Sequence, residues 1–73
     1  MDRTLRPVDN GCRYIVRDHA RGVAAALDLV PQLLALCPNG CYPVRIEVEK
    51  SYSGARDTMV CITFQVAGRP KRW

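Results

Sequence analysis

The sequence predicts a single small α+β domain, in the order β-α-β-β, with one helix packed on one face of a three-stranded sheet. Apolar and polar residues alternate over residues 12–17, 42–50 and 58–68, which is typical of strands with one buried face. Between the first two stretches, apolar residues recur at spacings of three and four, as on an amphipathic helix. The chain has 73 residues, 48% of them hydrophobic and 25% charged, which fits one ordinary globular domain.

The N-terminal residues 1–11 show no sustained period. They contain Pro7 and the turn pair Asn10-Gly11, so we expect an irregular arm that ends in a turn. The domain itself is expected over residues 12–68. It begins with CRYIVR, residues 12–17, a short strand with Cys12, Tyr14 and Val16 on one face.

The following segment, HARGVAAALDLVPQLLALC, predicts the helix. Asp18 is a residue type favoured at the N-cap. A wide apolar stripe that should face the sheet comprises Val23, Leu27, Val30, Leu34 and Cys37, with Ala26 and Leu33 beside it. Pro31 lacks a backbone donor, so we expect the helix to kink there or to restart as a second, shorter helix. Gly40 suits the left-handed residue that ends many helices.

Residues 42–50 form the clearest predicted strand, with Tyr42, Val44, Ile46 and Val48 on its apolar face. A loop, SYSGARD, joins it to a third strand over 58–68, whose apolar face has Val60, Ile62, Phe64 and Val66. A helical crossover sets the first two strands parallel if they share a sheet, and the hairpin adds the third strand antiparallel to the second. The face away from the helix is then mixed and charged, with Arg13, Ile15, Arg17, Arg45, Glu47, Glu49, Met59, Cys61, Thr63 and Gln65.

The motif LCPNGCYPV, residues 36–44, allows three interpretations. Cys37 and Cys41 have a spacing that zinc sites use, but a structural site needs four ligands, and Cys12, Cys61 and His19 lack knuckle-like neighbours. A disulfide is the second interpretation. We favour the third, in which Pro-Asn-Gly makes a turn and Cys37 is a small core hydrophobe. Cys12 and His19 could meet near the strand-to-helix junction, but Asp18, the one available orienting group, is more simply an N-cap, so we expect no enzymatic activity.

The net charge is +4, carried by nine arginines and two lysines against seven acidic residues. The tail Arg69-Pro70-Lys71-Arg72-Trp73 could contact phosphates and stack on a base, or serve as a solubilising tail. The hairpin loop has Tyr52 and Arg56, residue types that are enriched at binding hot spots. No signal peptide or long apolar segment is evident, which predicts a cytoplasmic protein with no membrane association.

These observations predict a small non-catalytic protein-binding module, such as a regulator, adaptor or inhibitor of a larger protein, with a homodimer as a further form. Size and composition fit a bacterial or phage accessory protein. No cofactor or metal is expected. The alternatives are a nucleic-acid-binding protein that uses the arginines of the sheet face and the basic tail, and a small zinc-stapled domain. The candidate partner-binding residues are Arg13, Arg17, Arg45, Tyr52, Arg56, Arg69, Lys71, Arg72 and Trp73.

Overall fold

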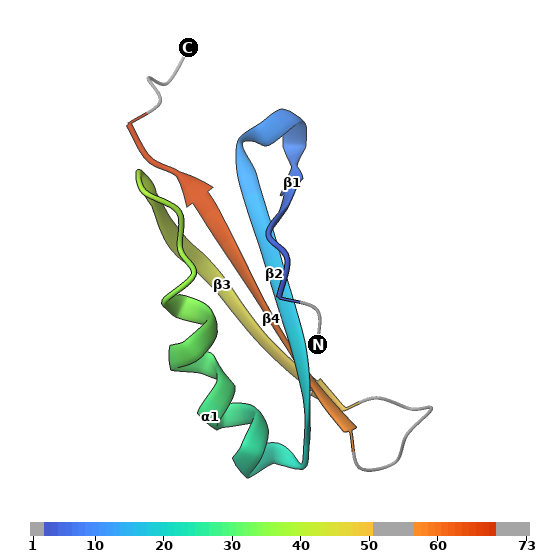
Figure 1. Ribbon diagram of the computed structural model, residues 1–73. Coiled ribbons are helices and arrows are strands. Elements are labelled where there is room, and N and C mark those ends of the chain that lie inside the picture. The colour runs from blue at the N-terminus through green and yellow to red at the C-terminus, as the bar shows by residue number, and fades with distance from the viewer. Residues whose placement is uncertain (1–2, 51–56, 69–73) are drawn as a thin grey trace.

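Strand β4 occupies the interior of the sheet, and every other part of the fold is placed relative to it. The structure, a computed structural model, describes residues 3–50 and 57–68. Over these residues the chain forms β1 (Arg6–Val8), a 3-10 turn (Asp9–Gly11), β2 (Arg13–Arg21), α1 (Val23–Leu34), β3 (Cys41–Lys50) and β4 (Asp57–Val66) (Figure 1). The sheet order is β1-β2-β4-β3, with every neighbouring pair antiparallel.

The predicted class, a small α+β domain with one helix on a sheet, is confirmed, but the predicted number of three strands is wrong for the described residues. The additional strand, β1, lies in the segment expected to be irregular, and it pairs with the start of β2. The predicted strand directions hold, because β2 and β3 both run antiparallel to β4 and are therefore parallel to each other. β4 lies between them and joins the two halves of the β-α-β unit.

The first long strand extends further than the sequence predicted. β2 continues to Arg21, which pairs with Asp57, so the predicted N-cap role of Asp18 and helical position of His19 are both wrong. The ten-residue β4 offers ladder partners along the whole of β2, and these hydrogen bonds hold residues 18–21 extended. The helix instead begins after Gly22, whose φ of 86° and ψ of 162° suit glycine almost exclusively.

Helix α1 is a single element that contains Pro31, as predicted for one helix, and the alternative of a second, shorter helix after Pro31 is wrong. The Pro31 carbonyl accepts a hydrogen bond from the backbone N–H of Ala35 at 3.1 Å, so helical hydrogen bonding continues after the proline. Gly40 has the expected positive φ of 81° but lies in a turn before β3, not at the helix end. In that turn the N–H of Cys41 donates to the Pro38 carbonyl at 3.1 Å, which makes Pro-Asn-Gly a turn as expected.

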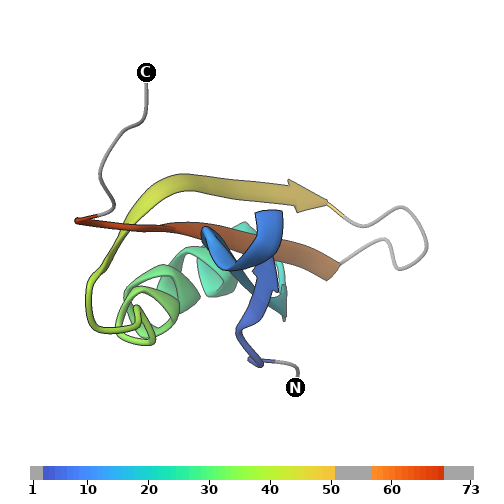
Figure 2. The same ribbon diagram turned by 90° about the horizontal axis from the view of Figure 1, so that it is seen from above.

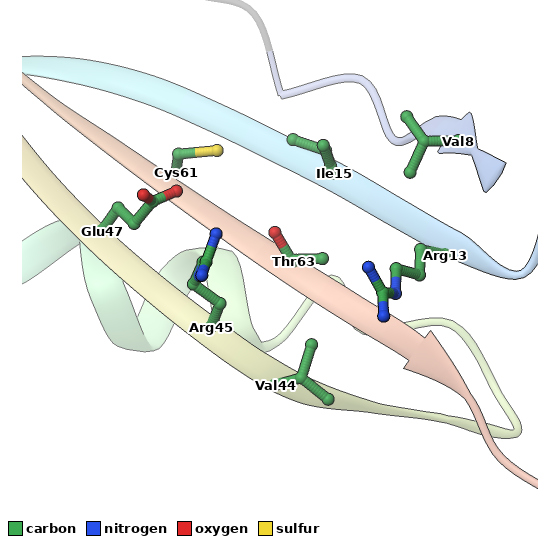
Figure 3. A pocket seen from close by; sticks show the side chains of 8 residues that line it. All are labelled: Val8, Arg13, Ile15, Val44, Arg45, Glu47, Cys61 and Thr63. Carbon is green, nitrogen blue, oxygen red and sulfur yellow. The ribbon is translucent and has the colours of Figure 1, made fainter.

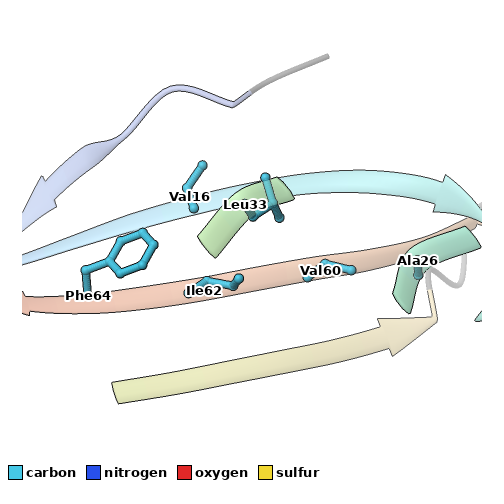
Figure 4. Close-up of a cluster of buried hydrophobic side chains, with 6 residues drawn as sticks. All are labelled: Val16, Ala26, Leu33, Val60, Ile62 and Phe64. Atoms are coloured by element: carbon cyan, nitrogen blue, oxygen red, sulfur yellow. The ribbon is translucent and has the colours of Figure 1, made fainter. Parts of the chain in front are cut away.

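The core lies between α1 and the β2–β4 pair (Figure 4), and it comprises Val16, Ala26, Leu33, Val60, Ile62 and Phe64. None of these six residues comes from β3. α1 packs on β2 and β4, and Figure 2 shows it along one face of the sheet. Nine consecutive residues of β3, from 42 to 50, are exposed. The helix is therefore too narrow a cover for a sheet of this width.

Candidate protein interface

Strand β3 is an edge strand with one uncovered side. It pairs with β4 on one side, and no described strand pairs with its other side. Backbone N–H and C=O groups at such an edge are free to pair with a strand from another chain. At the start of β3 the pairing is irregular, because Pro43 lies opposite Phe64 and Arg45 lies opposite Thr63, which leaves Val44 as the extra residue of a β-bulge.

The bulge changes which side chains share a face. Opposite residues in an antiparallel pair lie on the same face, so Ile46 and Val48 lie on the helix side with Ile62 and Val60. Tyr42 lies opposite Gln65, on the other face. Val44 lines a groove on that other face with Arg45 (Figure 3). The predicted single apolar face of Tyr42, Val44, Ile46 and Val48 is therefore wrong, since the bulge divides it after Val44.

The helix stripe is also rotated from its predicted position. Ala26 and Leu33 are fully buried, whereas Val23 is 47% exposed and Leu27 is 54% exposed. At about 100° per residue, Gln32 and Leu27 lie on opposite flanks of the helix relative to Leu33. The Gln32 flank faces β2 and the N-terminal arm, because Arg3 hydrogen-bonds to both Gln32 (3.2 Å) and Asp18 (2.6 Å). The flank with Leu27 therefore faces the β3 side.

These two results together define one apolar surface. Val23 and Leu27 from α1 face the side on which Ile46 and Val48 of β3 lie uncovered, at 47% and 38% exposure. We call these four residues the apolar ledge. Exposed apolar side chains that gather on one side of a fold are typical of a site that another molecule covers. Sequence reasoning missed the ledge because it placed all four residues in the core.

The opposite face of the sheet, which we call the open face, has the composition expected from the sequence. By register it includes Arg13, Ile15 and Arg17 of β2, and Arg45, Glu47 and Glu49 of β3. A groove of about 430 Å³ runs across it, with Thr63 of β4 between Arg13 and Arg45 (Figure 3). Arg13 donates to Gln65 at 2.8 Å and lies 3.4 Å from Asp9. Neither the Arg17 side chain nor the Arg45 side chain forms a hydrogen bond or ion pair with another described residue.

The remaining candidate partner-binding residues lie outside the described residues. They are Tyr52, Arg56, Arg69, Lys71, Arg72 and Trp73. The structure therefore brings together Arg13, Arg17 and Arg45 on one face and leaves the contributions of the loop and tail as predictions.

The cysteines form no metal cluster among the described residues, where no group of three His, Cys, Asp or Glu side chains is arranged to hold a metal ion. All four are free thiols. The Cys37 thiol donates to the carbonyl of Cys41 at 3.2 Å, and burial, with a smaller effect of Cys41, raises its pKa. Burial also raises the pKa of Cys61, against the opposing effect of Arg17. Neither thiol is activated as a nucleophile.

Cys12 and His19 do not form a pair. His19 lies seven positions after Cys12, which corresponds to about 23 Å along a strand. His19 lies on the open face opposite Met59. The structure thus provides no Cys-His constellation in the described part of the chain.

No helix in the part of the chain that the structure describes is long and apolar enough to cross a membrane. Comparison of the chain with known proteins found no matching family model, no matching curated protein and no matching solved structure.

Proposed function

We propose that the protein is a small non-catalytic protein-binding module whose contact surface is the β3 side of the sheet. The observation that supports this proposal is the coincidence of an unpaired edge with the apolar ledge: β3 is exposed from Tyr42 to Lys50, and Ile46 and Val48 lie uncovered on the side that the Leu27 flank of the helix faces. A partner strand that extends the sheet would pair the backbone of β3, and its side chains would cover the ledge. Roles as a regulator, adaptor or inhibitor all fit such a module.

Nucleic-acid binding through the open face is the second candidate. It is favoured by the common face of Arg13, Arg17 and Arg45 and by the absence of described partners for the last two. Glu47 and Glu49 lie on the same face, however, and would repel a phosphate backbone. The ledge has no role in this candidate function, which is why protein binding is preferred.

Quantitative affinity capture from an extract of the organism that encodes the chain distinguishes the two functions. The wild type is compared with Val48→Lys, which places a charge on the ledge, and with Arg17→Ser, which changes the open face. We expect a protein that is retained by the wild type and by Arg17→Ser, is lost with Val48→Lys, and resists high salt, because apolar contacts release few counterions.

Capture that survives Val48→Lys would contradict the proposal. Salt-sensitive retention of nucleic acid that is lost with Arg17→Ser would support the second candidate instead. Both positions are exposed, so each variant should fold, which circular dichroism would verify.

A further inference from the structure

The sequence of the β3 edge is suited to pairing with itself. We infer that the occupant of the β3 side is a second copy of this chain, with β3 pairing antiparallel to β3 of its partner around a two-fold axis that passes between Ile46 and its copy. This inference rests on the proposed function and names the protein that occupies the interface. The resulting assembly would be a continuous eight-stranded sheet.

The faces of the strand limit the registers that are allowed. In an antiparallel pair, opposite residues lie on the same face. On the regular part of β3, Ile46 and Val48 face the helix side, while Arg45, Glu47 and Glu49 face the open side. A symmetric pairing must therefore centre on a residue, because a centre between two residues would set Ile46 opposite Glu47 or Val48 opposite Glu47.

Charge then selects among the remaining registers. A centre at Val48 sets Glu47 opposite Glu49 twice, and a centre at Glu47 sets that residue opposite its own copy. Like charges directly opposite each other destabilise a sheet. A centre at Ile46 sets Arg45 opposite Glu47 on both sides of the axis. Neither side chain has a hydrogen bond or ion pair with another described residue of its own chain, so both side chains are available for this pairing.

The same register also covers Ile46, the central β3 residue of the apolar ledge. A two-fold axis perpendicular to the sheet places both α1 helices on the same face, with Ile46 opposite its copy between them. Val48 then lies toward the start of the partner's β3, near its bulge. Pro43 and the bulge at Val44 disfavour pairing with another strand at the start of β3. Regular pairing is therefore confined to the centre of the strand.

Charge reversal tests the inference directly, with the association state measured by native mass spectrometry and analytical ultracentrifugation. We expect the wild type to be a dimer. Arg45→Glu sets Glu opposite Glu twice and Glu47→Arg sets Arg opposite Arg twice, so each variant alone should raise the dimer dissociation constant by about tenfold or more. An equimolar mixture of the two should restore a dimer of one copy of each, because every opposite pair is again complementary.

The control is Arg17→Glu, which makes the same charge change on the open face of β2 and should leave the dimer intact. A monomeric wild type, or a dimer that persists in both single variants, would overturn the inference. If the wild type is monomeric but captures another protein that Val48→Lys does not capture, self-pairing is rejected and the proposed function stands. If the wild type is monomeric and its capture of a protein does not depend on Val48, both the self-pairing and the proposed function are rejected.

Discussion

At the scale of the residue, Asp18 shows how one position can satisfy two sequence patterns. Its residue type is favoured at helix N-caps, but it also continues the inward alternation of Tyr14 and Val16. In the structure it is buried on β2, and its carboxylate accepts from Arg3 at 2.6 Å and from the backbone N–H of His19 at 2.8 Å. Arg3 is fifteen positions away, so no local pattern could have identified it as the partner.

The Asp18 carboxylate should contribute to stability at neutral pH. Burial raises the pKa of Asp18, but the hydrogen bonds from Arg3 and His19 and the Arg3 charge outweigh burial, and the net pKa is lowered. A lowered folded-state pKa stabilises the fold above the ordinary aspartate pKa of about 3.9, and the stabilisation is lost as pH falls below it. Asp18→Asn should therefore lower the free energy of unfolding by about 1–3 kcal/mol at pH 7.

Urea unfolding from pH 7 to pH 2 would measure this effect, with the difference between the two proteins expected to narrow below about pH 4. Asp9→Asn is the matched control, because the Asp9–Arg13 pair is at least half exposed on both sides and should change stability by no more than about 0.5 kcal/mol. A difference for Asp18→Asn that stays constant with pH would mean that its charge is not the cause.

At the scale of the element, periodicity predicted which helix residues share a face but not which of them face the core. The apolar stripe of α1 is present, but the residues buried against the sheet are Ala26 and Leu33, while Leu27 lies at the side of the stripe and is exposed. The bulge in β3 had a readable signal. Pro43 interrupts an otherwise alternating strand, and proline within a sheet is confined to edge strands and bulges. This residue could have predicted both the edge position of β3 and the change of face after Val44.

Two leucines of the same helix should differ sharply when each is truncated. Leu33 is fully buried against the sheet, so Leu33→Ala removes core contacts and leaves a cavity, which should cost about 2–5 kcal/mol. Leu27 is 54% exposed, and Leu27→Ala should cost less than about 1 kcal/mol in the isolated chain. Urea unfolding of both variants under one buffer condition would measure the difference. Equal losses would mean that Leu27 contributes to the core as much as Leu33 does, and would contradict its exposed position.

At the scale of the whole molecule, the order of the strands was the feature that the local pattern predicted least. A β-α-β-β sequence permits β4 either outside β3 or between β2 and β3, and the hairpin is the same in both. One signal favoured the central position: residues 59–64, MVCITF, are almost continuously apolar, as in strands buried on both faces. The buried thiol of Cys61 on the open face agrees with it. β3, in contrast, carries charges at alternate positions from Arg45 to Glu49, which is typical of an edge.

The uncovered ledge has a consequence for the stability of the molecule as a whole. If a second copy covers Ile46 and its neighbours, folding and association are linked, and the thermal unfolding midpoint should rise with protein concentration. The wild type should show this rise, and Arg45→Glu should not, although both chains have the same core. Differential scanning calorimetry over a wide range of concentration would measure the midpoints, with Arg17→Glu as the control that keeps the concentration dependence. A wild-type midpoint that is independent of concentration would mean that the six-residue core stabilises the isolated chain unaided and that its ledge stays exposed.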